Sequence, residues 1–132
     1  GWKLPVIHLR VMPMEERNRL PELSRCEEMV LSVLWDMDGR ITLNELTNEV
    51  NIRYAKPWAP QTVSTMIKRT KNKGFIDAYR EGRYVYYTIL VKRESYRRQV
   101  SERVLSILYK GSKDQMLSDI RKAPTGKGDY ET

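Results

Sequence analysis

The chain has 132 residues, 40% of them hydrophobic and 31% charged, which suits one small domain with an added oligomerisation segment. Lysine and arginine number 24 against 17 aspartate and glutamate residues, so the net charge is +7. A basic excess of this size favours polyanionic partners, nucleic acid first and anionic membrane second. The plain alternative is a basic protein without such a partner.

Cysteine and histidine are nearly absent from the chain, which has only Cys26 and His8. That composition excludes an intramolecular disulfide framework and zinc sites built from several such residues. The chain has no apolar run of about 18 residues, so we predict no membrane contact, and its N-terminus lacks a signal-peptide core. We therefore expect a cytoplasmic protein without metal or cofactor. A redox role for Cys26 is less favoured than a place in the core.

The first 21 residues lack the helical periodicity of the residues after them, and we expect a flexible N-terminal extension there. Two capping boxes then predict two helices. The first box joins Ser24 to Glu27, and that helix ends at Asp38-Gly39; its apolar stripe runs from Cys26 to Met37. The second box joins Thr42 to Glu45. The acidic side chains of these helices are interpreted as capping or exposed residues: Glu27, Glu28, Glu45 and Glu49.

A third helix is predicted over 60–73, with Pro60 in its first turn and Gly74 just past its end. Its apolar side chains recur at helical spacing on one face. No carboxylate occurs from residue 50 to 76. The opposite face therefore presents amides, hydroxyls and cations, the groups that hydrogen-bond to phosphates and base edges. By itself, this face is equally well explained as a solvated basic surface.

After Gly74 the period changes to alternation, which predicts a hairpin with strands at 75–80 and 83–91 and a tight turn at Glu81-Gly82. Arg80, Arg83 and Tyr84 stand at its tip. Three helices followed by a basic-tipped hairpin is the order of a winged helix-turn-helix domain, which we place at 22–91. The fold class predicted is therefore mainly α with a small β-hairpin, α+β.

Residues 92–122 are predicted to form a helical dimerisation arm, because their apolar stripe faces away from a completed winged-helix core. The alternative is that the stripe folds back on its own domain. Residues 123–132 are polar and predict a disordered tail. The residues assigned to the dimer interface are Tyr96, Val100, Val104, Ile107, Leu108, Met116, Leu117 and Ile120.

Four segments resemble the BlaI/MecI/CopY bacterial repressors, the penicillinase repressor family. They are SRCEEMVLSVLW (24–35), PWAPQTVSTMIKRTKNKGFI (57–76), EGRYVYYTILV (81–91) and ESYRRQVSERVLSILYKG (94–111). The resemblance implies a homodimer that represses genes by binding an inverted-repeat operator. Copper-responsive members carry a Cys-rich C-terminal motif, and no cysteine follows Cys26. β-Lactam-responsive members are cut at an Asn–Phe bond, matched here by Asp119-Ile120, so a sensor protease is not supported by the sequence.

The function predicted is a sequence-specific DNA-binding repressor. Gln61 is suited to a contact with adenine, and the hydroxyls of Thr62, Ser64 and Thr65 are suited to contacts with phosphate or the thymine methyl group. The hairpin, or wing, is suited to contacts with the DNA backbone through the residues at its tip. The alternative is a winged-helix interaction module that docks an acidic partner without binding DNA. An enzyme is not expected, since no nucleophile–base arrangement or nucleotide glycine motif occurs. The predicted DNA-binding residues are Gln61, Thr62, Ser64, Thr65, Lys68, Arg69, Arg80, Arg83 and Tyr84.

Overall fold

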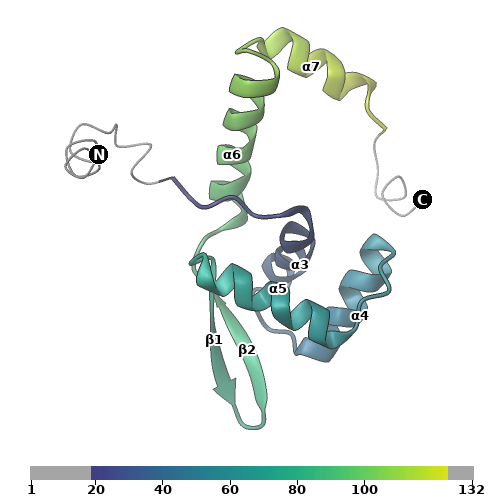
Figure 1. The fold of residues 1–132 in the computed structure, drawn as a ribbon, viewed down its shortest axis with the longest axis vertical. Coiled ribbons are helices and arrows are strands. Elements are labelled where there is room, and N and C mark those ends of the chain that lie inside the picture. Colours follow the sequence, from purple (N-terminus) through teal and green to yellow (C-terminus); the bar gives the residue numbers. More distant parts are fainter. Residues whose placement is uncertain (1–18, 125–132) are drawn as a thin grey trace, which may run out of the picture.

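The computed structural model describes residues 19–124, and these form three helices, a two-stranded antiparallel hairpin and a helical arm (Figure 1). This arrangement confirms the predicted α+β class. The elements are α3 (Arg25–Asp36), α4 (Leu43–Tyr54), α5 (Pro60–Asn72), β1 (Ile76–Glu81), β2 (Tyr84–Ile89), α6 (Arg93–Arg103), the π-helical segment η1 (Val104–Leu108) and α7 (Lys113–Lys122).

The helices begin and end where local chemistry dictates. Both capping boxes form, with the N–H of Glu27 donating to Ser24 Oγ at 3.1 Å in the first. Pro60 occupies the first position of α5, and Gly74 follows that helix with a φ of +85°. A backbone with positive φ suits glycine, which has no Cβ to clash. The three helices of the body therefore lie where the sequence predicted them.

The hairpin turn lies one residue later than predicted. Glu81 pairs with Tyr84 across the strands, so the two turn residues are Gly82 and Arg83 rather than Glu81 and Gly82. Gly82 has a φ of +63°, and the first position of a two-residue type II′ turn prefers glycine for that reason. The glycine therefore sets the register, and the predicted turn was wrong by one position.

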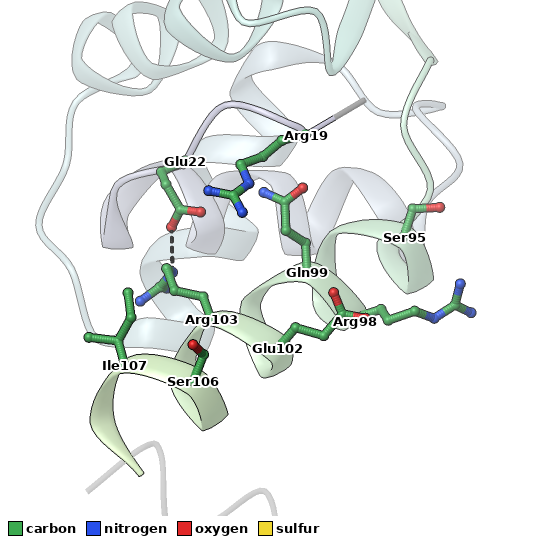
Figure 2. Close-up of a pocket in the computed structure, with 9 residues that line it drawn as sticks. All are labelled: Arg19, Glu22, Ser95, Arg98, Gln99, Glu102, Arg103, Ser106 and Ile107. Atoms are coloured by element: carbon green, nitrogen blue, oxygen red, sulfur yellow. Dashed lines mark ion pairs between the residues drawn. The ribbon is translucent and has the colours of Figure 1, made fainter. Parts of the chain in front are cut away.

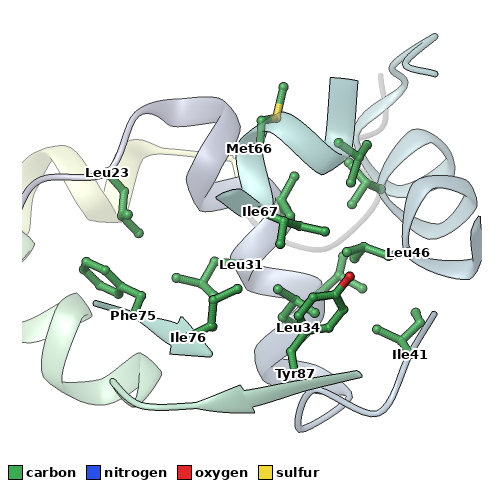
Figure 3. Packing of buried hydrophobic residues seen from close by; sticks show 14 of the residues in the cluster. Leu23, Leu31, Leu34, Ile41, Leu46, Met66, Ile67, Phe75, Ile76 and Tyr87 are labelled. Carbon is green, nitrogen blue, oxygen red and sulfur yellow. The ribbon is translucent and has the colours of Figure 1, made fainter. Parts of the chain in front are cut away.

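One hydrophobic core joins the three helices to the root of the hairpin (Figure 3). Helix α3 lies at its centre and is buried on two sides. Met37 was predicted to continue its stripe but is 45% exposed, because α3 has ended and Met37 serves as the C-cap. The largest fully buried apolar side chains are Phe75, Leu31, Leu34, Leu46, Ile76, Val30, Val33, Val50 and Val63.

The turn after α3 packs tightly against β2. Gly39 has a φ of +75°, and its carbonyl accepts a hydrogen bond from the N–H of Tyr87 at 3.0 Å. A Cβ at position 39 would lie 1.9 Å from the carbonyl oxygen of Tyr87. Only glycine fits here, for reasons of both space and backbone conformation.

The arm differs from the prediction in its first turns. Tyr96 of α6 is 4% exposed and packs edge-on against Phe75 with 5.4 Å between ring centroids. The prediction that it belongs to an unpartnered apolar stripe is wrong: it completes the core. Val100 packs half-buried beside that core. Beyond them the arm extends away from the body, and neither η1 nor α7 contains a buried residue (Figure 1).

The π-helical segment η1 separates α6 from the turn before α7. The N–H of Tyr109 donates to the carbonyl of Val104, five residues earlier, at 3.2 Å. This spacing is one residue wider than in an α-helix. In the part of the chain that the structure describes, no helix is long and apolar enough to span a membrane.

The N-terminal extension was predicted to be flexible throughout 1–21. Leu20 is instead fastened to α6, because the side-chain amide of Gln99 bonds to both its N–H and its carbonyl at 2.8 Å. The expectations for residues 1–18, which include His8, and for the tail at 125–132 lie outside the described residues.

Candidate nucleic-acid interface

Helix α5 buries one face and exposes the other. Val63, Met66, Ile67 and Thr70 face the core, whereas every side chain predicted to read DNA from this helix is exposed. The hydroxyl of Thr65 donates to the carbonyl of Gln61 at 3.1 Å, so its oxygen remains available as an acceptor. The exposed polar side chains are Gln61, Thr62, Ser64, Thr65, Lys68 and Arg69.

The N-terminus of α5 is held by an asparagine that sequence reasoning missed. The amide of Asn51, on α4, donates to the carbonyl of Trp58 at 2.8 Å and accepts from its N–H at 3.2 Å. Trp58 lies two residues before Pro60, the first residue of α5. This clasp fixes where α5 starts, and with it the position of Gln61. No local pattern around Asn51 signals the contact, because its partner is a backbone seven residues away.

The C-terminus of α5 is held by an ion pair whose carboxylate is buried. Lys73 Nζ lies 2.6 Å from Glu27 Oε1, and the Glu27 side chain is 4% exposed. Burial acts to raise the pKa of Glu27, but the hydrogen bonds from Lys73 and from the N–H of Ser24 outweigh it and hold that pKa below its usual range. Glu27 had been interpreted as a capping residue alone. It also ties α3 to the end of α5.

The wing presents its three predicted residues to solvent. Arg80, Arg83 and Tyr84 are all exposed at the far end of the hairpin. The guanidinium of Arg83 stacks 5.2 Å from the ring centroid of Tyr84 and donates to its hydroxyl at 3.1 Å. This stacking holds the Arg83 cation in one place on the tip.

A third arginine, Arg40, braces the wing and was not identified from the sequence. It donates to Glu81 at 2.8 Å and to the hydroxyl of Tyr79 at 2.7 Å, and it stacks 4.1 Å from the ring centroid of Tyr86. The hydrogen bond to Glu81 is the main cause that raises the pKa of the Arg40 guanidinium further above its usual value. Because Arg40 pairs with Glu81, the negative charge of this carboxylate near the wing tip is compensated.

Taken together, α5 and the wing offer hydrogen-bonding groups and cations held by the fold itself. The described part of the chain contains no cluster of three or more His, Cys, Asp or Glu side chains able to hold a metal ion. Cys26 is half-buried and packs against the core. The chemistry available at this surface is therefore the recognition of anions and polar edges.

The helix order, the basic face of α5 and the braced hairpin define the protein as a member of the winged-helix class. Residues 23–131 match the family model of the penicillinase repressor, and the chain belongs to that family. Proteins of this family are transcriptional repressors and not enzymes.

Two relatives show how far the similarity extends. The methicillin resistance regulatory protein MecI of Staphylococcus aureus (strain N315) is 30% identical over 94 residues, which cover 71% of this chain and 74% of MecI. The penicillinase repressor of Bacillus licheniformis is 29% identical over 100 residues, 76% of each chain.

Two solved structures resemble this chain over 59% of its length. One is the solution structure of the DNA-binding domain of the repressor BlaI, with 31% identity, 92% of that chain covered and a TM-score of 0.49. The other is the Bacillus licheniformis BlaI monomer in complex with the blaP half-operator, with 31% identity, 92% coverage and a TM-score of 0.48.

Proposed function

We propose that the protein is a dimeric transcriptional repressor that binds an inverted-repeat operator. Helix α5 would enter the major groove of each half-site, and the wing would lie on the neighbouring backbone. The observation that carries this proposal is the exposed front of α5, which has no carboxylate and is anchored at both ends. Acting on DNA would place the protein in the cytoplasm of a bacterial cell.

The roles on α5 divide along its length. Gln61 stands in the first turn, where an amide can bond bidentately to an adenine. The hydroxyls of Thr62, Ser64 and Thr65 suit phosphate or thymine-methyl contacts, and Lys68 and Arg69 suit phosphate, with guanine as a second option for Arg69. Phosphate contacts supply most of the affinity and its salt dependence, while the few base contacts supply sequence choice.

The division of the chain into a DNA-binding domain at 22–91 and a dimerisation arm at 92–122 is part of the same proposal. Its support lies in the far half of the arm, where Ile107 and Leu108 are 67% and 70% exposed. Leu117 and Ile120 of α7 are exposed as well. Large apolar side chains that are this exposed favour burial against a second copy of the chain. The first turns of α6 belong to the body through Tyr96.

The test begins with selection of bound fragments from genomic DNA by the full chain, followed by fluorescence anisotropy on the selected duplex. Gln61→Ala should weaken specific binding by about 1–3 kcal/mol and barely change binding to scrambled DNA. Lys68→Ala should weaken both and reduce the salt slope by about one. Lys113→Ala, an exposed cation on α7, is the control and should change neither.

The alternative function, docking of an acidic protein partner, predicts a different result. The wild-type chain would then show no strong salt-dependent affinity for any duplex, and selection would return no palindrome. If Gln61→Ala and Lys68→Ala behave alike on operator and scrambled DNA, the division of roles along α5 is wrong.

A further inference from the structure

Residues 20–24, which we call the strap, contact three helices at once. Lys73 at the end of α5 donates to the carbonyl of Glu22 at 2.8 Å. The N–H of Leu23 donates to the Tyr96 hydroxyl of α6 at 3.1 Å, and the Leu23 side chain is buried in the core. Ser24 caps α3. The strap therefore lies where the end of α5 and the start of the arm come together.

Gln99 makes the most specific of these contacts. Its amide oxygen accepts from the N–H of Leu20 and its amide nitrogen donates to the carbonyl of the same residue, both at 2.8 Å. Gln99 is half-buried. A side-chain amide that satisfies both polar groups of one residue fixes the direction of the strap as well as its distance from α6.

A second contact lies one helical turn further along α6. Arg103 Nε is 2.9 Å from Glu22 Oε1 (Figure 2). The buried Nε has no aligned hydrogen bond, so this contact is one of charge alone. Both side chains are more than a third exposed, and a pair of this kind contributes little to stability. Its position matters more than its strength, because it extends the strap's hold along α6.

The strap does not pack continuously onto α6. A cavity of about 450 Å³ lies beside it, lined by Arg19, by Glu22 of the strap and by side chains of α6 and η1, including Gln99 and Ser106 (Figure 2). Point contacts across an open space, and not a filled interface, therefore set the angle between α6 and the body on this side. Loss of the Gln99 clasp would leave room for the angle to change.

We propose that the strap, through Gln99 as a positioning residue, fixes the orientation of the arm relative to α5 and so sets the half-site spacing that the dimer accepts. This inference rests on the proposed function. Two recognition helices joined by a rigid arm gain affinity only when both reach their half-sites together. A loosened arm would still read each half-site but would tolerate other spacings.

The test compares Gln99→Ala with Ser95→Ala, a truncation of an exposed side chain one turn earlier on α6. Binding is measured to a single half-site duplex and to operators whose spacing is changed by one or two base pairs. Gln99→Ala should leave the affinity for a single half-site unchanged and lower the affinity for the native operator about fivefold. It should also reduce the difference in affinity between the native operator and operators with altered spacing. Ser95→Ala should match the wild type. A Gln99→Ala protein that keeps the wild-type spacing preference overturns the proposal.

A measurement without DNA separates failure of this inference from failure of the proposed function. Spin labels at Asn48→Cys on α4 and Ser106→Cys on η1, in a Cys26→Ser background diluted with unlabelled protein, report the angle between arm and body. The distance distribution should broaden in Gln99→Ala and stay narrow in Ser95→Ala; an unchanged width overturns the strap's role. Arg103→Gln leaves the Gln99 contact in place and should broaden the distance distribution less than Gln99→Ala. It is the variant to measure if Gln99→Ala does not fold.

Discussion

The body, from α3 to β2, and the far half of the arm, η1 and α7, carry similar apolar stripes, but only the body buries its stripe. In α3 the stripe is closed on two sides by the rest of its own chain, and Val30, Leu31, Val33 and Leu34 are fully buried. In η1 and α7 no residue of the stripe is buried. Helical periodicity alone does not distinguish these cases, because it reports which face is apolar and not what covers it. Two changes test the contrast, and two smaller ones test contacts that hold the body together.

The largest effect is expected at Gly39. Gly39→Ala places a Cβ 1.9 Å from the carbonyl oxygen of Tyr87, at a φ of +75° that side chains rarely adopt. We expect a loss of about 4 kcal/mol or more in the free energy of unfolding, measured by urea denaturation. The matched control in the arm is Gly111→Ala, where φ is +84° and no atom lies within 4 Å. If both cost the same, packing against β2 is not the reason that glycine is needed.

The next change removes one leucine from each region. Leu31→Ala should lower the free energy of unfolding by about 3 kcal/mol at every protein concentration, since it leaves a cavity in a closed core. Leu117→Ala should leave a dilute monomer within about 0.5 kcal/mol of the wild type. It should, however, reduce the rise of the thermal midpoint with protein concentration that dimerisation produces. An equal concentration dependence in all three proteins would argue against the arm as a dimer interface.

A smaller effect is expected from Glu27, whose pKa is held below its ordinary value of 4.5. The folded state thus binds its proton less readily than the unfolded chain, so the ion pair stabilises the fold above about pH 4.5 and is lost as the pH falls through the lower folded value. Glu27→Gln should make the free energy of unfolding fall less steeply as the pH is lowered below about 4.5. Glu49→Gln removes a carboxylate that is 45% exposed, and in this variant the free energy of unfolding should fall more steeply than in Glu27→Gln. Identical curves would place the acid sensitivity elsewhere, with Asp36 the first residue to examine.

The smallest effect is expected at the wing. Arg40→Ala should leave global unfolding unchanged, because the side chain is solvent-exposed. It should speed amide hydrogen exchange in β1 and β2. It should also lower the affinity for operator DNA and for scrambled DNA alike, by roughly two- to threefold. Arg97→Ala, an exposed arginine on α6, is the control. A selective loss of operator affinity would instead make Arg40 a reader of sequence.

Much of the body was predictable from short-range chemistry. The capping boxes, Pro60 and Gly74 act within one helical turn, so their positions in the sequence suffice to locate the helices. The exposed front of α5 followed from periodicity and from the absence of carboxylates. The set of DNA-contacting residues remains a prediction, although each one lies on the surface where it was expected.

The residues missed are those whose partners lie more than one helical turn away in the chain. Glu27 has the right spacing for a capping box, and that local role concealed its ion pair with Lys73, 46 residues later. Tyr96 continues a helical stripe, yet Phe75 and the strap enclose it. Asn51, Arg40 and Gln99 have no local signature at all, because each recognises a backbone or a side chain brought close only by the finished fold.

The π-helical segment makes the effect of losing a residue depend on where it is lost. Hydrogen bonds in η1 close over five residues where an α-helix closes them over four, so η1 takes up about one extra residue at nearly the same rotation. Deleting a single residue from 104–106 should therefore relax η1 to an α-helix and leave Ile107 and Leu108 facing nearly the same way. The same deletion within α6 should instead rotate everything beyond it by about 100° around the axis. In this part of the protein the place of a deletion, more than the identity of the residue lost, decides which way the apolar surface faces.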